Sequence, residues 1–236
     1  MPVKEEDFSA VLRALPRLGC LGVNVTIPHK EAAYALVDTC DPLAARIGAV
    51  NTVVIEKDGM LHGANTDIYG FKTNLEQAGY DMKSGAALVL GAGGAARAVL
   101  ASLQQENCPR IFLANRTPER AAALAAHFGD PVTALPWEER ETHLGAIKLV
   151  VNTTSLGLDG ADDVPLDLSA LPGEAAVCDL VYRPLETGLL RRARSRGLRA
   201  VDGLGMLLGQ AQESFRLWFG FAPDVTPELR RHVLEQ

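Results

Sequence analysis

The sequence predicts an α/β fold built around a largely parallel sheet. From residue 86 onward, short runs of Val, Ile and Leu alternate with segments of helical pattern, as in successive βαβ units. One of these runs leads through glycines directly into a helical segment, which is the order that a parallel nucleotide-binding sheet requires. The chain before residue 84 has a different pattern, so we expect it to form a separate part of the molecule.

The elements of the expected parallel sheet can be justified in chain order. Residues 86–91 form a compact apolar strand that ends in glycine, and residues 93–105 are rich in Ala and Leu, which suits a helix. A second helix is expected at 117–128, with Thr117 as N-cap and Pro118 in the first turn. Further strands are expected at 110–116, 147–155, 175–182 and 198–203, and a further helix at 185–197.

The first part of the chain is expected to hold a strand at 22–28 and a hairpin at 49–67. The hairpin turns at residues 57–59, because Asp58-Gly59 suits a tight hairpin turn. A helix follows at 67–78, and residues 82–85 form the expected linker. The final segment is helical over 204–219 and 227–234, and we expect it to return and pack on the first part.

Composition and charge disfavour several classes of protein. Apolar residues make up 47% and charged residues 22%, as in soluble globular proteins. The sequence contains no run of about 18 apolar residues, the length that a membrane-spanning helix needs. The net charge of −6, without a basic stripe, disfavours nucleic acid as a partner. The scattered cysteines form no C-x-x-C pair, and the acidic N-terminus does not resemble a signal peptide. We expect a cytoplasmic protein with reduced thiols and no metal.

A glycine-rich loop predicts a nucleotide site. Gly91 to Ala96 fit G-x-G-x-x-A between a strand and a helix. Gly91 permits the tight turn, Gly93 lets the backbone approach a pyrophosphate, and Ala96 allows close packing of helix and strand. The helix N-terminus then offers free N–H groups to the phosphates.

The end of the next strand favours NADP over NAD. NAD sites usually place a carboxylate there, whereas this sequence has Asn115-Arg116-Thr117 and, one turn later, Arg120. Two guanidinium groups and a hydroxyl could bind a 2′-phosphate. The alternative is that both arginines are solvated cations, although cations oppose the dipole at a helix N-terminus.

Hydride transfer with such a cofactor needs a general acid and base beside the reacting oxygen. Lys30 follows a strand and Pro28, and Asp67 begins a helix after another strand. A carboxylate near Lys30 would orient its ammonium group and tune its pKa. The alternatives are a solvated loop lysine and an aspartate that only caps a helix.

A set of strings in fixed order resembles the shikimate dehydrogenase family over nearly the whole chain. Any one of them could arise by chance, but the ordered set is specific. The strings are NVTIPHK (24–30), GAVNT (48–52), ANTD (64–67), GAGGAA (91–96), NRT (115–117), NTTS (152–155), DLVY (179–182) and GLGMLLGQ (203–210).

The resemblance implies a two-domain α/β protein that reversibly reduces 3-dehydroshikimate to shikimate with NADPH, within aromatic amino-acid biosynthesis. It implies a substrate-binding domain over residues 1–82 and 206–236 and a Rossmann NADP-binding domain over residues 83–205. The partners would be this small molecule and NADP, in a monomer or a homodimer. An NAD-preferring quinate/shikimate dehydrogenase and a non-catalytic NADP-binding remnant are the alternatives.

The resemblance also implies roles for individual residues. Lys30 and Asp67 match the catalytic pair, which also contacts substrate, and Thr26, Asn51, Tyr182 and Gln210 match other substrate-binding positions. The implied cofactor contacts are Gly91, Ala92, Gly93, Gly94, Ala95, Asn115, Arg116, Thr117, Arg120, Thr153, Ser155, Val181, Gly203, Met206 and Leu207.

The chain departs from the family pattern at its start. Members of the family begin with a strand that carries a Gly-x-Pro motif and a Ser-x-Ser pair, and a helix follows this strand. The present sequence begins in what resembles the stretch after that strand and helix. Ser9 is the only serine before Thr26. We therefore expect a sheet that lacks a strand, which would expose apolar surface, and weaker binding of the substrate carboxylate.

Overall fold

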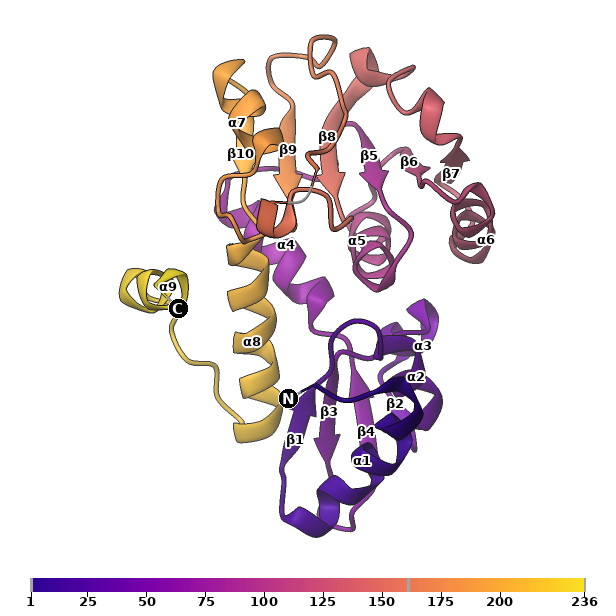
Figure 1. Cartoon of the computed structure of the whole chain (residues 1–236), viewed down its shortest axis with the longest axis vertical. Helices are drawn as coiled ribbons and strands as arrows, with labels where there is room; N and C mark the ends of the chain where they lie inside the picture. Colours follow the sequence, from indigo (N-terminus) through magenta and orange to yellow (C-terminus); the bar gives the residue numbers. More distant parts are fainter. Residues whose placement is uncertain (1, 161, 236) are drawn as a thin grey trace.

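The computed structural model describes residues 2–160 and 162–235, and these residues form two lobes, each with its own sheet (Figure 1). The larger lobe holds a six-stranded sheet and the smaller lobe a four-stranded one. Two buried apolar clusters belong to the larger sheet, and a third, which includes Leu12, Val53 and Leu61, fills the smaller lobe. The predicted α/β class is confirmed.

The larger sheet is parallel throughout, as the alternating pattern predicted. Helices α5 (Gly94–Gln105) and α6 (Pro118–Phe128) connect its first three strands in chain order, and α7 (Gly188–Ser195) connects its last two. The strand order is β10 (Arg199–Val201), β9 (Ala176–Asp179), β8 (Ile147–Asn152), β5 (Ala86–Leu90), β6 (Ile111–Ala114) and β7 (Val132–Leu135).

The strand order reverses between β5 and β8. From β5 the chain continues to β6 and β7 on one side, whereas β8, β9 and β10 extend the sheet on the other. Ligands of open parallel sheets bind at the carboxyl ends of the strands at such a point. The glycine-rich loop follows β5, and residues 152–155 lie at the end of β8, so both of these predicted motifs lie at the reversal.

The smaller sheet contains the predicted hairpin. Strands β3 (Thr52–Ile55) and β4 (Leu61–Ala64) are antiparallel, and Gly59 takes the left-handed conformation in their turn at φ = 86°. The strand predicted at 22–28 is only β1 (Gly22–Asn24), because Thr26 to His29 form a turn closed by the bond from His29 N to Thr26 O (2.9 Å). Strand β2 (Thr39–Cys40) runs parallel to β4.

Several short elements were not predicted from the sequence. Strand β7 has only four residues, and the three helices of the smaller lobe have six or seven, which is too few to show a helical period. These helices are α1 (Phe8–Ala14), α2 (Lys30–Leu36) and α3 (Pro42–Ile47). Short 3₁₀ helices lie at Glu5–Asp7, Leu15–Leu18, Trp137–Glu139, Leu144–Ala146 and Leu158–Gly160.

Two long helices join the lobes. Helix α4 (Asp67–Gln77) leads from the smaller sheet to the larger one, and α8 (Leu204–Phe219) returns beside it (Figure 1). The expected return of α8 is confirmed, since the indole Nε1 of Trp218 donates to Val53 O on β3 (3.0 Å). None of the described helices is long and apolar enough to cross a bilayer.

The expectation that residues 227–234 also pack on the first part of the chain was wrong for helix α9 (Pro227–Leu234). It buries none of its residues, and Arg230 ties it to Asp202 at the base of α8 through two contacts of 2.7 and 2.6 Å. Its few apolar residues include Leu229 and Leu234, which remain 39% and 42% exposed. An eight-residue helix with so little apolar area is held by an ion pair rather than by burial on the smaller lobe.

Gly70 sets the distance between α4 and α8, and this yields a prediction. A Cβ atom there would lie 2.5 Å from Met206 O and 2.8 Å from Gln210 N, both of them backbone atoms. Gly70→Ala is therefore expected to lower the free energy of unfolding by at least about 1 kcal/mol, although alanine favours helix. Chemical denaturation measures the loss.

Gly173→Ala is the matched control, because nothing lies within 4 Å of a Cβ atom at that position. It is expected to change the free energy of unfolding by less than about 0.5 kcal/mol. Equal stability of the Gly70→Ala variant and the parent protein would contradict the close helix packing described above.

Candidate active site

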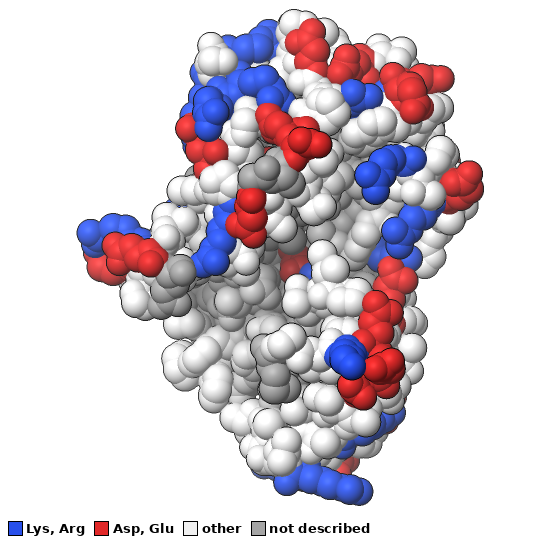
Figure 2. Space-filling view, in the orientation of Figure 1, with Lys and Arg blue, Asp and Glu red and all other residues white. Residues whose placement is uncertain are grey.

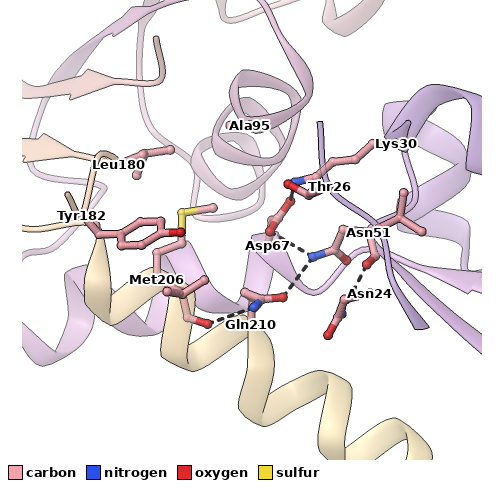
Figure 3. Close-up of a pocket in the computed structure, with 13 residues that line it drawn as sticks. Asn24, Thr26, Lys30, Asn51, Asp67, Ala95, Leu180, Tyr182, Met206 and Gln210 are labelled. Atoms are coloured by element: carbon pink, nitrogen blue, oxygen red, sulfur yellow. Dashed lines mark hydrogen bonds and ion pairs between the residues drawn. The ribbon is translucent and has the colours of Figure 1, made fainter. Parts of the chain in front are cut away.

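A cavity of about 440 Å³ lies between the lobes at the carboxyl edge of the parallel sheet. Figure 2 shows the surface hollowed between the two lobes, with acidic and basic side chains interspersed around it. Both lobes supply its walls, and the helices α4 and α8 supply its floor (Figure 3). The lining residues are Asn24, Val25, Thr26, Lys30, Asn51, Asp67, Ala95, Leu180, Tyr182, Gly203, Met206, Leu207 and Gln210.

An ion pair between Lys30 and Asp67 stands in this cavity. Lys30 Nζ lies 2.5 Å from Asp67 Oδ2, and the two side chains are only 13% and 8% exposed. Lys30 begins α2 and Asp67 begins α4. A carboxylate suits a helix N-terminus and an ammonium group does not, so Asp67 offsets the unfavourable position of Lys30.

Asn51 fixes the second oxygen of the Asp67 carboxylate. Its amide Nδ2 donates to Asp67 Oδ1 (2.9 Å), while its Oδ1 accepts from the backbone N–H of Thr66 (2.7 Å). The same Nδ2 lies 3.4 Å from Gln210 Oε1. Because both oxygens of Asp67 have partners, the carboxylate holds the ammonium group of Lys30 in one orientation (Figure 3).

A buried hydroxyl lies behind the part of the cavity that Asn24 and Asn51 line. Ser214 Oγ is fully buried and accepts from Asn24 Nδ2 (2.8 Å). It also lies 2.9 Å from Thr52 Oγ1 and 3.0 Å from Thr66 Oγ1. The sequence interpretation missed these residues. One signal was available, since Ser214 follows Gln210 by one helical turn and so shares its face of α8.

The glycine-rich loop has the geometry that its sequence predicted. Gly91 has φ = 105°, and a Cβ atom there would lie 2.5 Å from Thr153 Oγ1. Nothing lies within 4 Å of a Cβ atom at Gly93, so the backbone before α5 is open to a ligand. Gly94 lies against Lys30, with 3.3 Å between a Cβ position and Lys30 Cδ. The loop therefore places the N-terminus of α5, where backbone N–H groups are free to bind an anion, next to the cavity that holds Lys30.

The predicted phosphate clamp, which consists of Asn115, Arg116, Thr117 and Arg120, lies beside two further cavities. Asn115 and Arg116 line one of about 460 Å³ together with Thr154 and Ser155. Arg120 lines another of about 340 Å³ together with Ala92 of the glycine-rich loop. Arg116, Thr117 and Arg120 are exposed, and Asn115 Nδ2 donates to Thr117 O (2.9 Å). Exposed guanidinium groups beside open cavities can reach a bound phosphate.

The wall opposite Lys30 differs from the prediction at one position. Leu180 lines the cavity, whereas the predicted residue Val181 is only 5% exposed and does not line it. Alternation along an extended segment turns neighbouring side chains to opposite faces, so only one of the two can face the ligand. Gly203 lies close behind, because a Cβ atom there would approach Leu180 O to 2.3 Å.

The remaining predicted substrate residues meet in the same cavity. Thr26, Tyr182 and Gln210 line it, and in Figure 3 Tyr182 and Met206 lie across the cavity from Lys30. Hydroxyl and amide groups of this kind bind a ligand that carries several hydroxyls. With an acid and base at one side and an open helix N-terminus behind it, the arrangement suits proton transfer to an alcohol or ketone beside a nucleotide.

Family models match three parts of the chain. Residues 1–53 match the shikimate dehydrogenase substrate binding domain, residues 73–157 match shikimate / quinate 5-dehydrogenase, and residues 203–227 match the shikimate 5′-dehydrogenase C-terminal domain. The matched segments include Lys30, Ala95 and Gln210, which line one cavity.

Curated relatives and solved structures agree with these matches. The chain is 55% identical to shikimate dehydrogenase (NADP(+)) of Paramagnetospirillum magneticum, over 99% of this chain and 86% of the relative. The structure of shikimate 5-dehydrogenase from Thermus thermophilus, in complex with NADP(H) and shikimate, is similar with a TM-score of 0.87 and 43% identity, covering 99% of this chain and 85% of that one. Quinate dehydrogenase from Corynebacterium glutamicum, in complex with NAD, has a TM-score of 0.92 and 34% identity, covering 100% and 85%.

Proposed function

The chain belongs to the shikimate dehydrogenase family, and we propose that it catalyses the reversible NADP-dependent reduction of 3-dehydroshikimate to shikimate. This activity places it in the shikimate pathway of aromatic amino-acid biosynthesis. The observation that carries the proposal is the buried pair of Lys30 and Asp67 beside the glycine-rich loop, in a cavity lined with amide and hydroxyl groups.

The residues around the glycine-rich loop fit NADP. Space in front of Gly93 leaves the N-terminus of α5 open for the pyrophosphate, and Ala95 lines the central cavity. Arg116 and Arg120 would hold the 2′-phosphate, with Asn115 and Thr117 beside them. When bound, NADPH supplies the hydride that the reduction requires. Gly203, Met206 and Leu207 would form the wall beside the reacting ring.

Lys30 would move the proton. In the direction of reduction, its ammonium group donates a proton to the ketone oxygen as the carbon receives the hydride, and the hydroxyl of shikimate forms. In the direction of oxidation, the neutral amine accepts the hydroxyl proton. Asp67 would hold Lys30 toward the reacting oxygen, since its other oxygen is already fixed by Asn51.

The other polar residues of the cavity would hold the ring. Thr26, Asn51 and Gln210 come from the smaller lobe and α8, and Tyr182 comes from the larger lobe. Residues 1–82 and 206–236 would thus bind the substrate, and residues 83–205 would bind NADP. We place the enzyme in the cytoplasm, which the four free cysteines support.

The catalytic role of Lys30 gives the first activity prediction. Lys30→Ala is expected to lower kcat by about 10² to 10⁴-fold, the usual contribution of a positioned acid or base. NADPH oxidation with 3-dehydroshikimate measures this, and the dissociation constant for NADP should stay within about threefold of the parent value. Lys4→Ala is the matched control, because the side chain of Lys4 is 78% exposed. Full turnover by Lys30→Ala would remove the lysine from the mechanism.

The phosphate clamp gives a prediction on cofactor choice, which also separates NADP-dependent from NAD-preferring enzymes. Arg116→Ala is expected to raise KM for NADP about tenfold or more, because charge-assisted hydrogen bonds to the 2′-phosphate are lost. KM for NAD, which lacks that phosphate, should change little. Arg110→Ala is the control, because Arg110 is not one of the predicted phosphate-binding residues. Its guanidinium group lies over the ring of Phe112 in β6. Faster turnover with NAD than with NADP in the parent protein would favour the NAD-preferring alternative.

A further inference from the structure

A buried carboxyl group lies directly behind the cofactor side of the cavity. Asp179 ends β9, is 0% exposed, and is followed by Leu180, which lines the cavity. Burial raises the pKa of Asp179, while hydrogen bonds from Thr187, Val181 and Asn152 act in the opposite direction. A buried carboxyl group is costly unless it is hydrogen-bonded, so this one has to be explained by its partners.

The partners of Asp179 come from three separate places in the fold. Asn152 Nδ2, at the end of β8, and the backbone N–H of Val181 both donate to Oδ1, at 2.8 and 3.1 Å. Thr187 Oγ1 donates to Oδ2 at 2.7 Å. Thr187 is also the N-cap of α7, where its hydroxyl accepts from Leu190 N. One carboxyl group thus joins two loops and the start of a helix.

Asn152 extends this connection into the loop after β8. Its Oδ1 accepts from both the N–H and the hydroxyl of Thr154, at 3.0 and 2.7 Å, and its Nδ2 also donates to Leu156 O (3.2 Å). This loop carries Thr153, which meets Gly91, and Ser155, which lines the cavity beside Arg116. The orientation of the loop therefore depends on how Asn152 is held.

We propose that Asp179 is a positioning residue that fixes the loop after β8 and the loop after β9 relative to each other, so that both face NADP. The first loop provides Thr153 and Ser155, and the second provides Leu180 and Tyr182. Asp179 does not itself line the central cavity, so it acts through Asn152, Val181 and Thr187. This inference rests on the proposed NADP-dependent function.

Asp179→Asn tests the proposal because it keeps the shape of the side chain. An amide has one acceptor oxygen where the carboxylate has two, so either Thr187 or the pair of Asn152 and Val181 loses its acceptor. The dissociation constant for NADP, measured by calorimetry, is expected to rise about tenfold, and kcat is expected to fall with it.

Val177→Ala is the matched control on the same strand. Val177 is fully buried in β9 but belongs to the apolar cluster, so its truncation lowers stability without touching either loop. Its dissociation constant for NADP is expected to stay within about twofold of the parent value at a similarly lowered Tm. An equal loss of NADP affinity in Val177→Ala would overturn the proposal, as would unchanged affinity in Asp179→Asn.

Changes at Thr187 keep the test decisive if Asp179→Asn does not fold. Thr187→Ser retains the hydroxyl and should bind NADP as the parent does, whereas Thr187→Val loses it and should bind about tenfold more weakly. Equal affinity of these two variants would overturn the proposal. Failure of the parent protein itself to bind NADP would instead refute the proposed function.

Discussion

The ion pair between Lys30 and Asp67 puts two charged groups in a position where the two side chains are only 13% and 8% exposed. Two charges at low exposure lose most of their hydration, and that loss exceeds their mutual attraction unless further hydrogen bonds compensate. Asn51 and the N-terminus of α4 provide the compensation for Asp67. The proposed proton transfer by Lys30 explains why the cavity contains an ion pair that is costly to bury.

Two glycines allow close contacts around that ion pair. Gly70 lets α8 lie directly on α4, and this places Gln210 within reach of Asn51. Gly94 lets the first turn of α5 lie against the side chain of Lys30, so the N-terminus of α5 and the ammonium group of Lys30 are close together. A side chain at Gly70 would push the two helices apart, whereas one at Gly94 would require the side chain of Lys30 to shift slightly.

The strongest sequence predictions were those in which a local pattern and its chemistry agree. The glycine-rich turn after an apolar strand and the Asp58-Gly59 hairpin follow from backbone sterics, which neighbouring residues alone largely determine. The meeting of Lys30 with Asp67 was a prediction of another kind. It was suggested by strand ends and by family resemblance, since 37 positions separate the two residues in the chain.

What the sequence could not provide are contacts set by tertiary packing. Helices α1 to α3 are too short to show a helical period of apolar residues, and α9 buries none of its residues. Ser214 and Asp179 look ordinary in the sequence, and only the fold shows how many donors and acceptors meet there. The choice between Leu180 and Val181 likewise depended on which way one extended segment faces.

A crystal structure of the protein with shikimate and NADP would show whether Lys30 is placed to transfer the proton. We expect Lys30 Nζ to lie within hydrogen-bond distance, about 3 Å, of the hydroxyl that is oxidised, with Asp67 still bound to the same ammonium group. The nicotinamide ring should face the carbon that bears this hydroxyl, on the side of Leu180 and Met206. A substrate bound with that hydroxyl turned away from Lys30, or a cofactor bound away from the glycine-rich loop, would contradict the proposed role of Lys30.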